Sequence, residues 1–215
     1  MNWLYKLERR FGRFCISNLM LYIVTTMLFV AIFDMVIGFP LSQWFTLIPS
    51  LVMRGQVWRL ITFIFLPPSG SPLLLVLSLY FYYVLGSTLE RVWGTFRFNL
   101  YYLFGLIGCM IAGMISGYGT NVYLNLSLFL AFAYLFPDHQ VLLFMIIPIK
   151  MKYLAYLNWA LFAVELLTGS WAAKAAIIAS LINFFIFFGP DIVNRIRGRR
   201  GNSVQRNFRN YYRNR

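Results

Sequence analysis

Charged residues, histidine and cysteine are all scarce in this chain of 215 residues. Asp, Glu, Lys and Arg together make up 12% of it, against roughly 25% in soluble domains, and 60% of the residues are hydrophobic. This balance excludes an ordinary soluble domain, because such a domain would have to hide too much apolar surface. The two cysteines, Cys15 and Cys109, provide no disulfide or metal-binding framework, and we expect no metal and no other cofactor.

Long apolar runs take the place of the missing charge. About 20 apolar helical residues cross a bilayer, and in lipid a helix satisfies its own backbone hydrogen bonds. We therefore predict an all-α polytopic membrane protein with six transmembrane helices, of which the fourth is short for a full crossing. The predicted spans are Leu19–Ile37, Leu73–Leu89, Phe98–Ser116, Val122–Phe136, Tyr153–Leu167 and Trp171–Phe188.

Basic residues are distributed unevenly between the two sides of these spans. With the N-terminus inside, only Arg54, Arg59 and Lys174 of the 19 Lys and Arg residues lie on the outer side, and the other 16 lie inside. Cytoplasmic loops are enriched in Lys and Arg, so this distribution favours an even number of spans and two cytoplasmic termini.

The chain divides into three segments. Residues 1–18 are predicted to form an interfacial amphipathic helix, 19–190 a single membrane domain, and 191–215 a basic, disordered cytoplasmic tail. Between Arg195 and Arg215 the tail carries eight arginines and no acidic residue. We expect it to bind anionic lipid headgroups, and we expect no nucleic-acid partner, because nothing like a folded RNA-binding module is present.

Two motifs flank the second predicted span. GQVWRLITFIFLPP precedes this span, and GSTLERVWGTFRFNLYY covers its far end and the residues after it. The residues of the two motifs are Trp58, Arg59, Gly86, Glu90, Trp93, Gly94, Arg97 and Phe98. This arrangement resembles the rhomboid superfamily of intramembrane proteins. The segment Ala131–Leu157, in which Leu-Phe-Pro is followed by Ile-Pro-x-Lys-x-Lys, resembles the connection between the fourth and fifth spans of bacterial rhomboid-like proteins.

The resemblance implies a six-helix rhomboid-like bundle with a membrane-embedded first loop, here Phe39–Ser71. We expect Arg59 to anchor this loop, because its guanidinium has five donors for backbone carbonyls. Glu90 and Arg97 flank the turn at Trp93 and Gly94, and we expect them to fix the two helices that meet there.

The catalytic residues of a rhomboid protease are not found where the resemblance implies them. Such a protease carries a serine in Gly-x-Ser-Gly near the outer end of the fourth span and a histidine base in the sixth. The nearest match in the fourth span is Asn125-Leu126-Ser127, and the only histidine, His139, lies in a loop predicted to be cytoplasmic. A serine hydroxyl needs an adjacent base to become a nucleophile. We therefore predict an inactive relative, a pseudoprotease similar to the Derlins.

Two alternatives remain open. Ser127 and Lys174 could share a depth in the membrane, and a lysine with a pKa lowered by burial can act as a general base, giving a divergent serine protease. Lys174 could instead pair with Glu165 near the outer surface. The second alternative is a small-molecule transporter or channel with an interior cavity, because polar residues are costly within spans. The candidate cavity residues are Asn125, Ser127, Asn158, Glu165, Lys174 and Asn183.

The resemblance suggests that the protein binds transmembrane segments of client proteins without cleaving them. We expect the binding surface to comprise the first loop with Trp44 and Trp58, the lateral gap between the second and fifth spans, and the short fourth helix. From the same resemblance we expect a multi-pass protein of a bacterial inner membrane.

Overall fold

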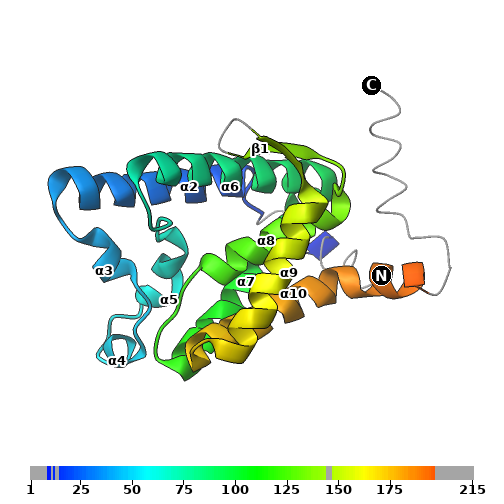
Figure 1. Cartoon of the computed structure of the whole chain (residues 1–215). Coiled ribbons are helices and arrows are strands. Elements are labelled where there is room, and N and C mark those ends of the chain that lie inside the picture. Colours follow the sequence, from blue (N-terminus) through cyan, green and yellow to red (C-terminus); the bar gives the residue numbers. More distant parts are fainter. Residues whose placement is uncertain (1–8, 11, 13–14, 144–146, 197–215) are drawn as a thin grey trace.

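The computed structural model describes residues 9–10, 12, 15–143 and 147–196 of the chain, and it is mostly helical (Figure 1). Each of the six predicted spans coincides with a helix. Their bounds are α2 Leu19–Ile32, α6 Pro72–Trp93, α7 Thr95–Ser116, α8 Val122–Leu135, α9 Met151–Thr168 and α10 Trp171–Ile196. A π-helical turn, η2 (Phe33–Ile37), extends α2 to the full length of the first predicted span.

Length and composition distinguish these helices from one another. Among the described residues, four stretches are long and apolar enough to cross a membrane, namely Leu19–Ile37, Pro72–Trp93, Thr95–Ser116 and Trp171–Gly189. Helix α8 is apolar but shorter, with 14 residues. Helix α9 has 18 residues, and Lys152, Asn158 and Glu165 interrupt its apolar sequence. The chain is thus a helical, multi-pass membrane protein, with four clear candidate spans in the part that the structure describes.

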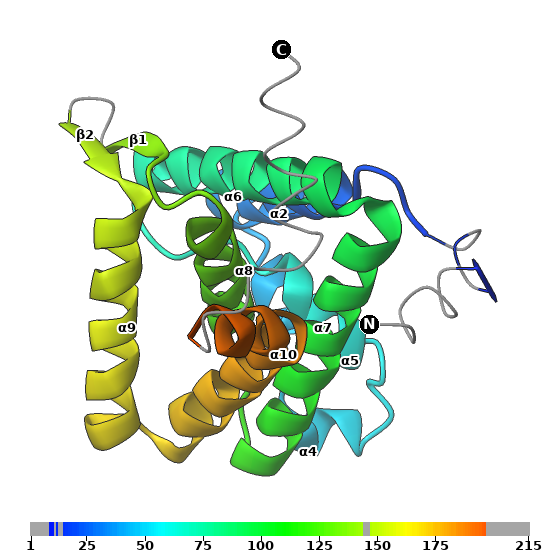
Figure 2. The ribbon, with the colours of Figure 1, turned by 90° about the vertical axis from the view of Figure 1, so that its right-hand side faces the viewer.

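Helix α8 lies at the centre of the bundle. Helices α7, α9 and α10 surround it, α6 crosses it, and α2 packs along α6 (Figure 2). Most of α8 is buried, including Leu124, Leu128 and Ala131. This helix of 14 residues is about 21 Å long. Because most of its residues are buried in the bundle, protein rather than lipid covers most of its surface.

Glycines allow the closest helix contacts. A Cβ atom on Gly105 of α7 would collide with Leu124, and it would come within 2.9 Å of the Asn183 amide on α10. One turn further, a Cβ on Gly108 would meet Ala179 at 3.3 Å. Small residues let helix backbones approach in this way, and α7 and α10 pack together extensively as a result.

The first loop is folded. It contains α3 (Leu41–Phe45), α4 (Pro49–Val52), α5 (Arg59–Thr62) and the 3₁₀ turn η3 (Phe63–Phe65). Leu47 is fully buried beside Gly113 and Gly119, and the Gly119 amide donates to the Leu47 carbonyl at 3.0 Å. The loop is therefore wedged against the connection between α7 and α8, as its apolar sequence indicates.

A β-hairpin in the connection between α8 and α9 was not predicted. Strands β1 (Gln140–Leu143) and β2 (Ile147–Lys150) pair antiparallel, with Gln140 opposite Lys150. The Met151 amide donates to the His139 carbonyl, and the Lys152 amide donates to the Pro137 carbonyl. These bonds fasten the base of the hairpin. A short apolar run does not by itself distinguish a strand from a helical segment, so the sequence pattern does not reveal this hairpin.

The two ends of the chain test the predicted segment boundaries only in part. Helix α10 continues to Ile196, so the helix runs past the expected boundary at residue 190. The predicted interfacial helix, residues 1–18, falls largely outside the described residues, and so do residues 197–215 of the predicted tail.

Candidate functional site

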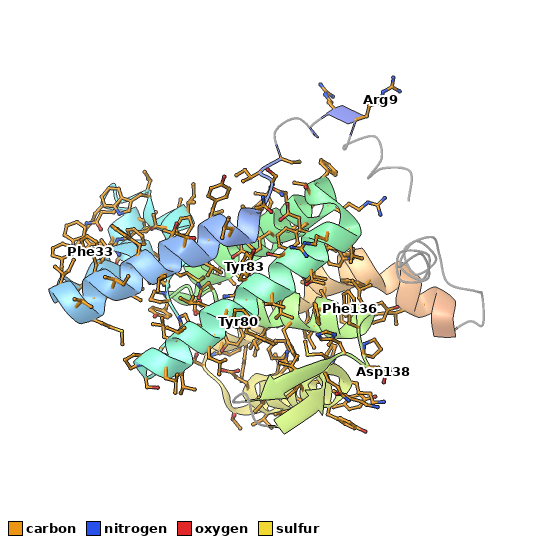
Figure 3. The ribbon with its side chains drawn as sticks, turned by 90° about the horizontal axis from the view of Figure 1, so that it is seen from above. Arg9, Phe33, Tyr80, Tyr83, Phe136 and Asp138 are labelled. Atoms are coloured by element: carbon orange, nitrogen blue, oxygen red, sulfur yellow. The ribbon has the colours of Figure 1, made fainter. Side chains whose placement is uncertain are left out.

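A groove of about 860 Å³ lies between α6, α8 and α9. In Figure 2, α6 crosses the top of the view, α9 runs down its left side, and α8 lies between them. Figure 3 shows Tyr80 on α6, at the wall of the groove, and Asp138 next to the hairpin. The groove-lining side chains are mainly apolar, and they include Leu73, Val76, Leu77, Phe81, Phe129, Phe132, Leu154, Leu157 and Leu161.

The hairpin closes one end of this groove. His139, Gln140 and Val141 contribute to the lining there. The His139 ring packs edge-on against Phe132, with ring centroids 5.7 Å apart. Lys152 and Asp138 form an ion pair at 3.3 Å across the base of the hairpin, and this hydrogen-bonded carboxylate raises the pKa of Lys152. The groove thus ends at the side of the bundle where α8 ends and α9 begins.

Two buried carboxamides also line the groove. The exposed fractions of Asn125 on α8 and Asn158 on α9 are 3% and 4%. The Asn158 amide nitrogen is 3.4 Å from the Leu126 carbonyl, to which it donates. Among the described residues, neither Asn125 Oδ1 nor Asn158 Oδ1 has a hydrogen-bond partner. Two of the predicted cavity residues are therefore brought to one site.

Ser127 faces the other side of α8. Its hydroxyl shares a hydrogen bond with the Tyr101 hydroxyl, 2.5 Å away, and it lies 3.2 Å from the Ser180 carbonyl, to which it can donate. The Asn183 amide in turn donates to the Tyr101 carbonyl. Ser127 is 1% exposed and does not line the groove. Its contacts join α8 to α7 and α10.

Lys174 and Glu165 each bind other groups. The Lys174 ammonium donates to the Leu167 carbonyl at 3.4 Å and lies over the Trp171 ring. The Glu165 carboxylate accepts from the Tyr123 hydroxyl at 2.5 Å. The expected pairing of Lys174 with Glu165 is not formed between these described side chains.

The geometry does not bring Lys174 to Ser127 either. The residue of α10 that contacts Ser127 is Ser180, six positions beyond Lys174. At 1.5 Å per residue, six positions correspond to about 9 Å along the helix. The alternative that Ser127 and Lys174 share a depth comes from the distance of each residue to the end of its own span. That reasoning treats the helices as parallel and level, whereas the packing of α8 on α10 sets their actual register.

Arg59 holds the first loop together. Its exposed fraction is 4%, and its guanidinium donates to the carbonyls of Gln43 and Thr46 at 2.6 and 2.7 Å and to the Gln56 side chain at 2.6 Å. Trp58, its neighbour in the motif, is 44% exposed on the surface of the loop.

The second motif lies at the junction of α6 and α7. Glu90 accepts from the Asn18 amide at 2.8 Å and from the Thr95 hydroxyl at 3.2 Å, so it ties the start of α2 to the turn. Gly94 has φ of 85°, a conformation that favours glycine, and Arg97 follows in the first turn of α7.

Two further residues of this motif make packing contacts. The Trp93 ring lies 5.3 Å from Tyr101 and 5.2 Å from Phe188, measured between centroids. Gly86 packs against Met20 of α2, where a Cβ atom would clash. The described contacts of Gly86, Glu90 and Trp93 are therefore packing and hydrogen-bonding contacts that hold the helices together.

The described residues contain no cluster of three His, Cys, Asp or Glu side chains that could hold a metal ion.

The sequence analysis did not identify Tyr101, the direct hydrogen-bond partner of Ser127. No linear pattern marks Tyr101, because the two residues come together only through the packing of α7 on α8.

Comparison with known families assigns most of this structure to one family. Residues 15–188 match the family described as eukaryotic integral membrane protein (DUF1751). The chain belongs to this family. The match runs from the residues before α2 into α10, so it includes the groove, both motifs and the hairpin. A search of the curated proteins returned no match.

Membership in DUF1751 establishes an integral membrane protein, and a rhomboid-like membrane protein is consistent with this family. The family description names eukaryotes, so it gives no support to the expected bacterial inner membrane.

Proposed function

We propose that this protein binds transmembrane segments of client membrane proteins in the groove between α6 and α9, without cleaving them. The observation that carries the proposal is the groove itself, with a volume of about 860 Å³ and a mainly apolar lining. An apolar hollow between membrane helices is accessible to a hydrophobic helix diffusing in the same bilayer. The proposal agrees with the lateral gap between the second and fifth spans that the rhomboid resemblance implies.

The short α8 supports binding in a second way. Protein covers most of this helix, but lipid can meet it where the groove opens beside it. At about 21 Å the helix is shorter than the roughly 30 Å hydrocarbon core of a bilayer, and lipid adjusts to such a mismatch by thinning. Thinner lipid next to the groove would loosen a client helix from its surroundings. A variant with a lengthened α8 that binds clients normally would count against this part of the proposal.

The bonding of Ser127 favours a pseudoprotease over the alternative protease with Ser127 and Lys174. Tyr101 and Ser180 both engage its hydroxyl. A fluorophosphonate serine probe tests the point directly. We expect no labelling of the wild-type protein in lipid. Labelling that disappears in both Ser127→Ala and Lys174→Ala would establish a serine protease instead.

The transporter or channel alternative has less support. The groove is lined mainly by apolar side chains, whereas a path for polar solutes needs polar groups along its length. Flux of a small solute into vesicles that contain the purified protein would overturn this preference.

We further propose that both termini lie in the cytoplasm and that the basic tail binds anionic lipid headgroups. Charge distribution supports both statements, since only three of 19 Lys and Arg residues lie on the outer side of a six-span arrangement.

Site-specific photocrosslinking tests client binding. A benzophenone amino acid at Leu157 would face the groove, and the same group at the neighbouring Tyr156 would not, although their exposed fractions are similar at 56% and 67%. We expect a model transmembrane peptide in the same vesicles to crosslink to position 157 well above position 156. Equal yields at the two positions would indicate random collision in the bilayer and would overturn the proposal.

A further inference from the structure

The groove is shorter than a bilayer is thick, whichever of its helices it is measured along. Its lining on α6 extends over residues 73–85, which is about 18 Å of helix. On α8 the lining extends over residues 125–132 and on α9 over residues 154–161, about 10 Å in each case. The hydrocarbon core of a bilayer is about 30 Å thick, so the groove can hold only part of a helix that crosses the whole membrane.

Polar residues limit the groove at its hairpin end. His139 and Gln140 contribute to the lining there, and both residues are exposed. The backbone groups in the last turn of a helix lack intrahelical partners, so a helix that ends here places them beside polar residues and not against an apolar wall. An apolar stretch of about 12 to 14 residues, which is about 18 to 21 Å long, fits within these limits.

The surrounding lipid decides what such a segment gains by entering the groove. Lipid tails are as apolar as leucine, so an apolar helix that matches the bilayer gains little from an apolar groove. An apolar stretch of about 14 residues is about 9 Å shorter than the hydrocarbon core. Each ångström of this mismatch costs free energy, because the bilayer has to thin around the helix. The short segment therefore gains more than the full-length helix when it leaves the lipid for the groove.

We infer that the groove selects client segments whose apolar stretch is too short to cross the bilayer, and that mismatch with the lipid drives these segments into it. This inference rests on the proposed function and specifies its substrate class. It differs from a general affinity for transmembrane helices, because a helix with about 20 apolar residues, which matches the bilayer, is bound less well although it offers more apolar surface.

The test compares two lysine-flanked Leu-Ala peptides in dioleoyl phosphatidylcholine vesicles that contain the full chain. Their apolar cores have about 14 and about 20 residues, which correspond to about 21 and 30 Å. A benzophenone amino acid at Leu157 reports the groove, and its crosslinking yield is divided by the yield at Tyr156, which does not line the groove. This ratio corrects for the amount of each peptide in the bilayer. A mismatch of about 9 Å corresponds to about tenfold in affinity, so we expect a ratio about tenfold higher for the short peptide.

Bilayer thickness separates the effect of mismatch from that of the peptide sequence. In vesicles of dimyristoleoyl phosphatidylcholine, which has shorter acyl chains, the short peptide matches the lipid better. Its advantage over the long peptide should therefore shrink to about twofold or less. A preference of the same size in both lipids would overturn the inference, because mismatch cannot then be its cause.

A pair of tryptophan variants connects the preference to the groove. Val76 lines the groove on α6 and is 57% exposed, whereas Ile111 on α7 is 52% exposed and does not line it. Val76→Trp enlarges a side chain at the wall of the groove and should lower the ratio of the short peptide by about threefold. Ile111→Trp should leave this ratio unchanged. A loss of equal size in both variants, or in neither, would overturn the inference.

Failure of the inference and failure of the proposed function give different results. Equal ratios for the two peptides in dioleoyl lipid, both above one, would overturn the inference and leave the proposed function intact. A higher ratio for the long peptide would do the same. If neither peptide crosslinks to position 157 above the background at position 156, the proposed function itself fails.

Discussion

At the scale of single residues, Arg59 shows how a buried charge can hold a loop in place. Its guanidinium binds two carbonyls and one side chain in a site with 4% exposure. Lysine has one compact ammonium group and cannot reproduce this planar set of donors. The stability of the first loop should therefore depend on arginine itself and not only on a positive charge.

We predict that Arg59→Lys destabilises the folded protein by about 1–3 kcal/mol, because at least one buried carbonyl loses its donor. Thermal unfolding of the protein in detergent measures the change. Arg54→Lys is the control, since Arg54 is exposed in the same loop and should tolerate lysine. Equal unfolding temperatures for the two variants would contradict the anchoring role.

Tyr101 offers a second prediction for a single residue. Tyr101→Phe removes the hydroxyl that shares a hydrogen bond with Ser127 and leaves the ring in its packed position. We expect a loss of about 1 kcal/mol of stability and no appearance of fluorophosphonate labelling, because Ser127 still donates to the Ser180 carbonyl. Tyr22→Phe, at a position 60% exposed, should unfold like the wild type. New labelling of Tyr101→Phe would mean that the tyrosine masks a reactive serine.

At the scale of helices, the contact between α7 and α10 depends on the absence of side chains. Gly105 has no space for a methyl group, since Leu124 and Asn183 already occupy it. Helix α8 packs against α7 and α10 as well as against α9, so this contact supports the helix that lines the groove. A change at Gly105 should therefore be transmitted to α8.

We predict that Gly105→Ala lowers stability by about 1–3 kcal/mol through overpacking, despite the higher helix propensity of alanine. Ile111→Ala in α7 is the control. Ile111 lies on the same helix and is 52% exposed, so trimming its side chain should change the stability little. Denaturation of both variants in the same detergent decides the point, and a neutral Gly105→Ala would contradict the close approach of α7 to Leu124 of α8 and Asn183 of α10.

At the scale of the whole molecule, the main prediction is the topology of the chain in its membrane. Six crossings put the first loop on the outer side and the turn after α8 on the inner side. Cysteine labelling can test this arrangement once Cys15 and Cys109 are replaced by serine. Met53 in the first loop is 83% exposed, and the Asp138 side chain after α8 is 73% exposed.

We predict that a membrane-impermeant maleimide added outside intact cells or sealed vesicles labels Met53→Cys and leaves Asp138→Cys unlabelled until the membrane is opened. In a eukaryotic internal membrane, the outer side corresponds to the lumen. Labelling of both cysteines from one side would mean that α6, α7 and α8 do not make an odd number of crossings, and it would rule out the six-span arrangement.

Much of this architecture could be predicted from the sequence, because apolar length and charge act locally. The scarcity of charge identified a membrane protein, and each of the six predicted spans coincides with a helix. The two motifs suggested a rhomboid-like membrane protein, with which the matched family is consistent, and the donors of Arg59 indicated a backbone anchor. In each case the responsible property belongs to one residue or to one contiguous run.

Tertiary packing decided the rest. The contact of Ser127 with Tyr101 and the arrangement of Asn125 and Asn158 around one groove join residues far apart in the chain. The hairpin after α8 is local, but its apolar run alone does not distinguish a strand from a helix. Neither alternative pairing of Lys174, with Ser127 or with Glu165, is formed between these described side chains, since helix register depends on how side chains fit across an interface and not on distance from a helix end. The sequence alone determined that this chain enters a membrane as helices. Only the folded packing determined which polar groups meet, because hydrogen bonds require atoms within about 3 Å of each other.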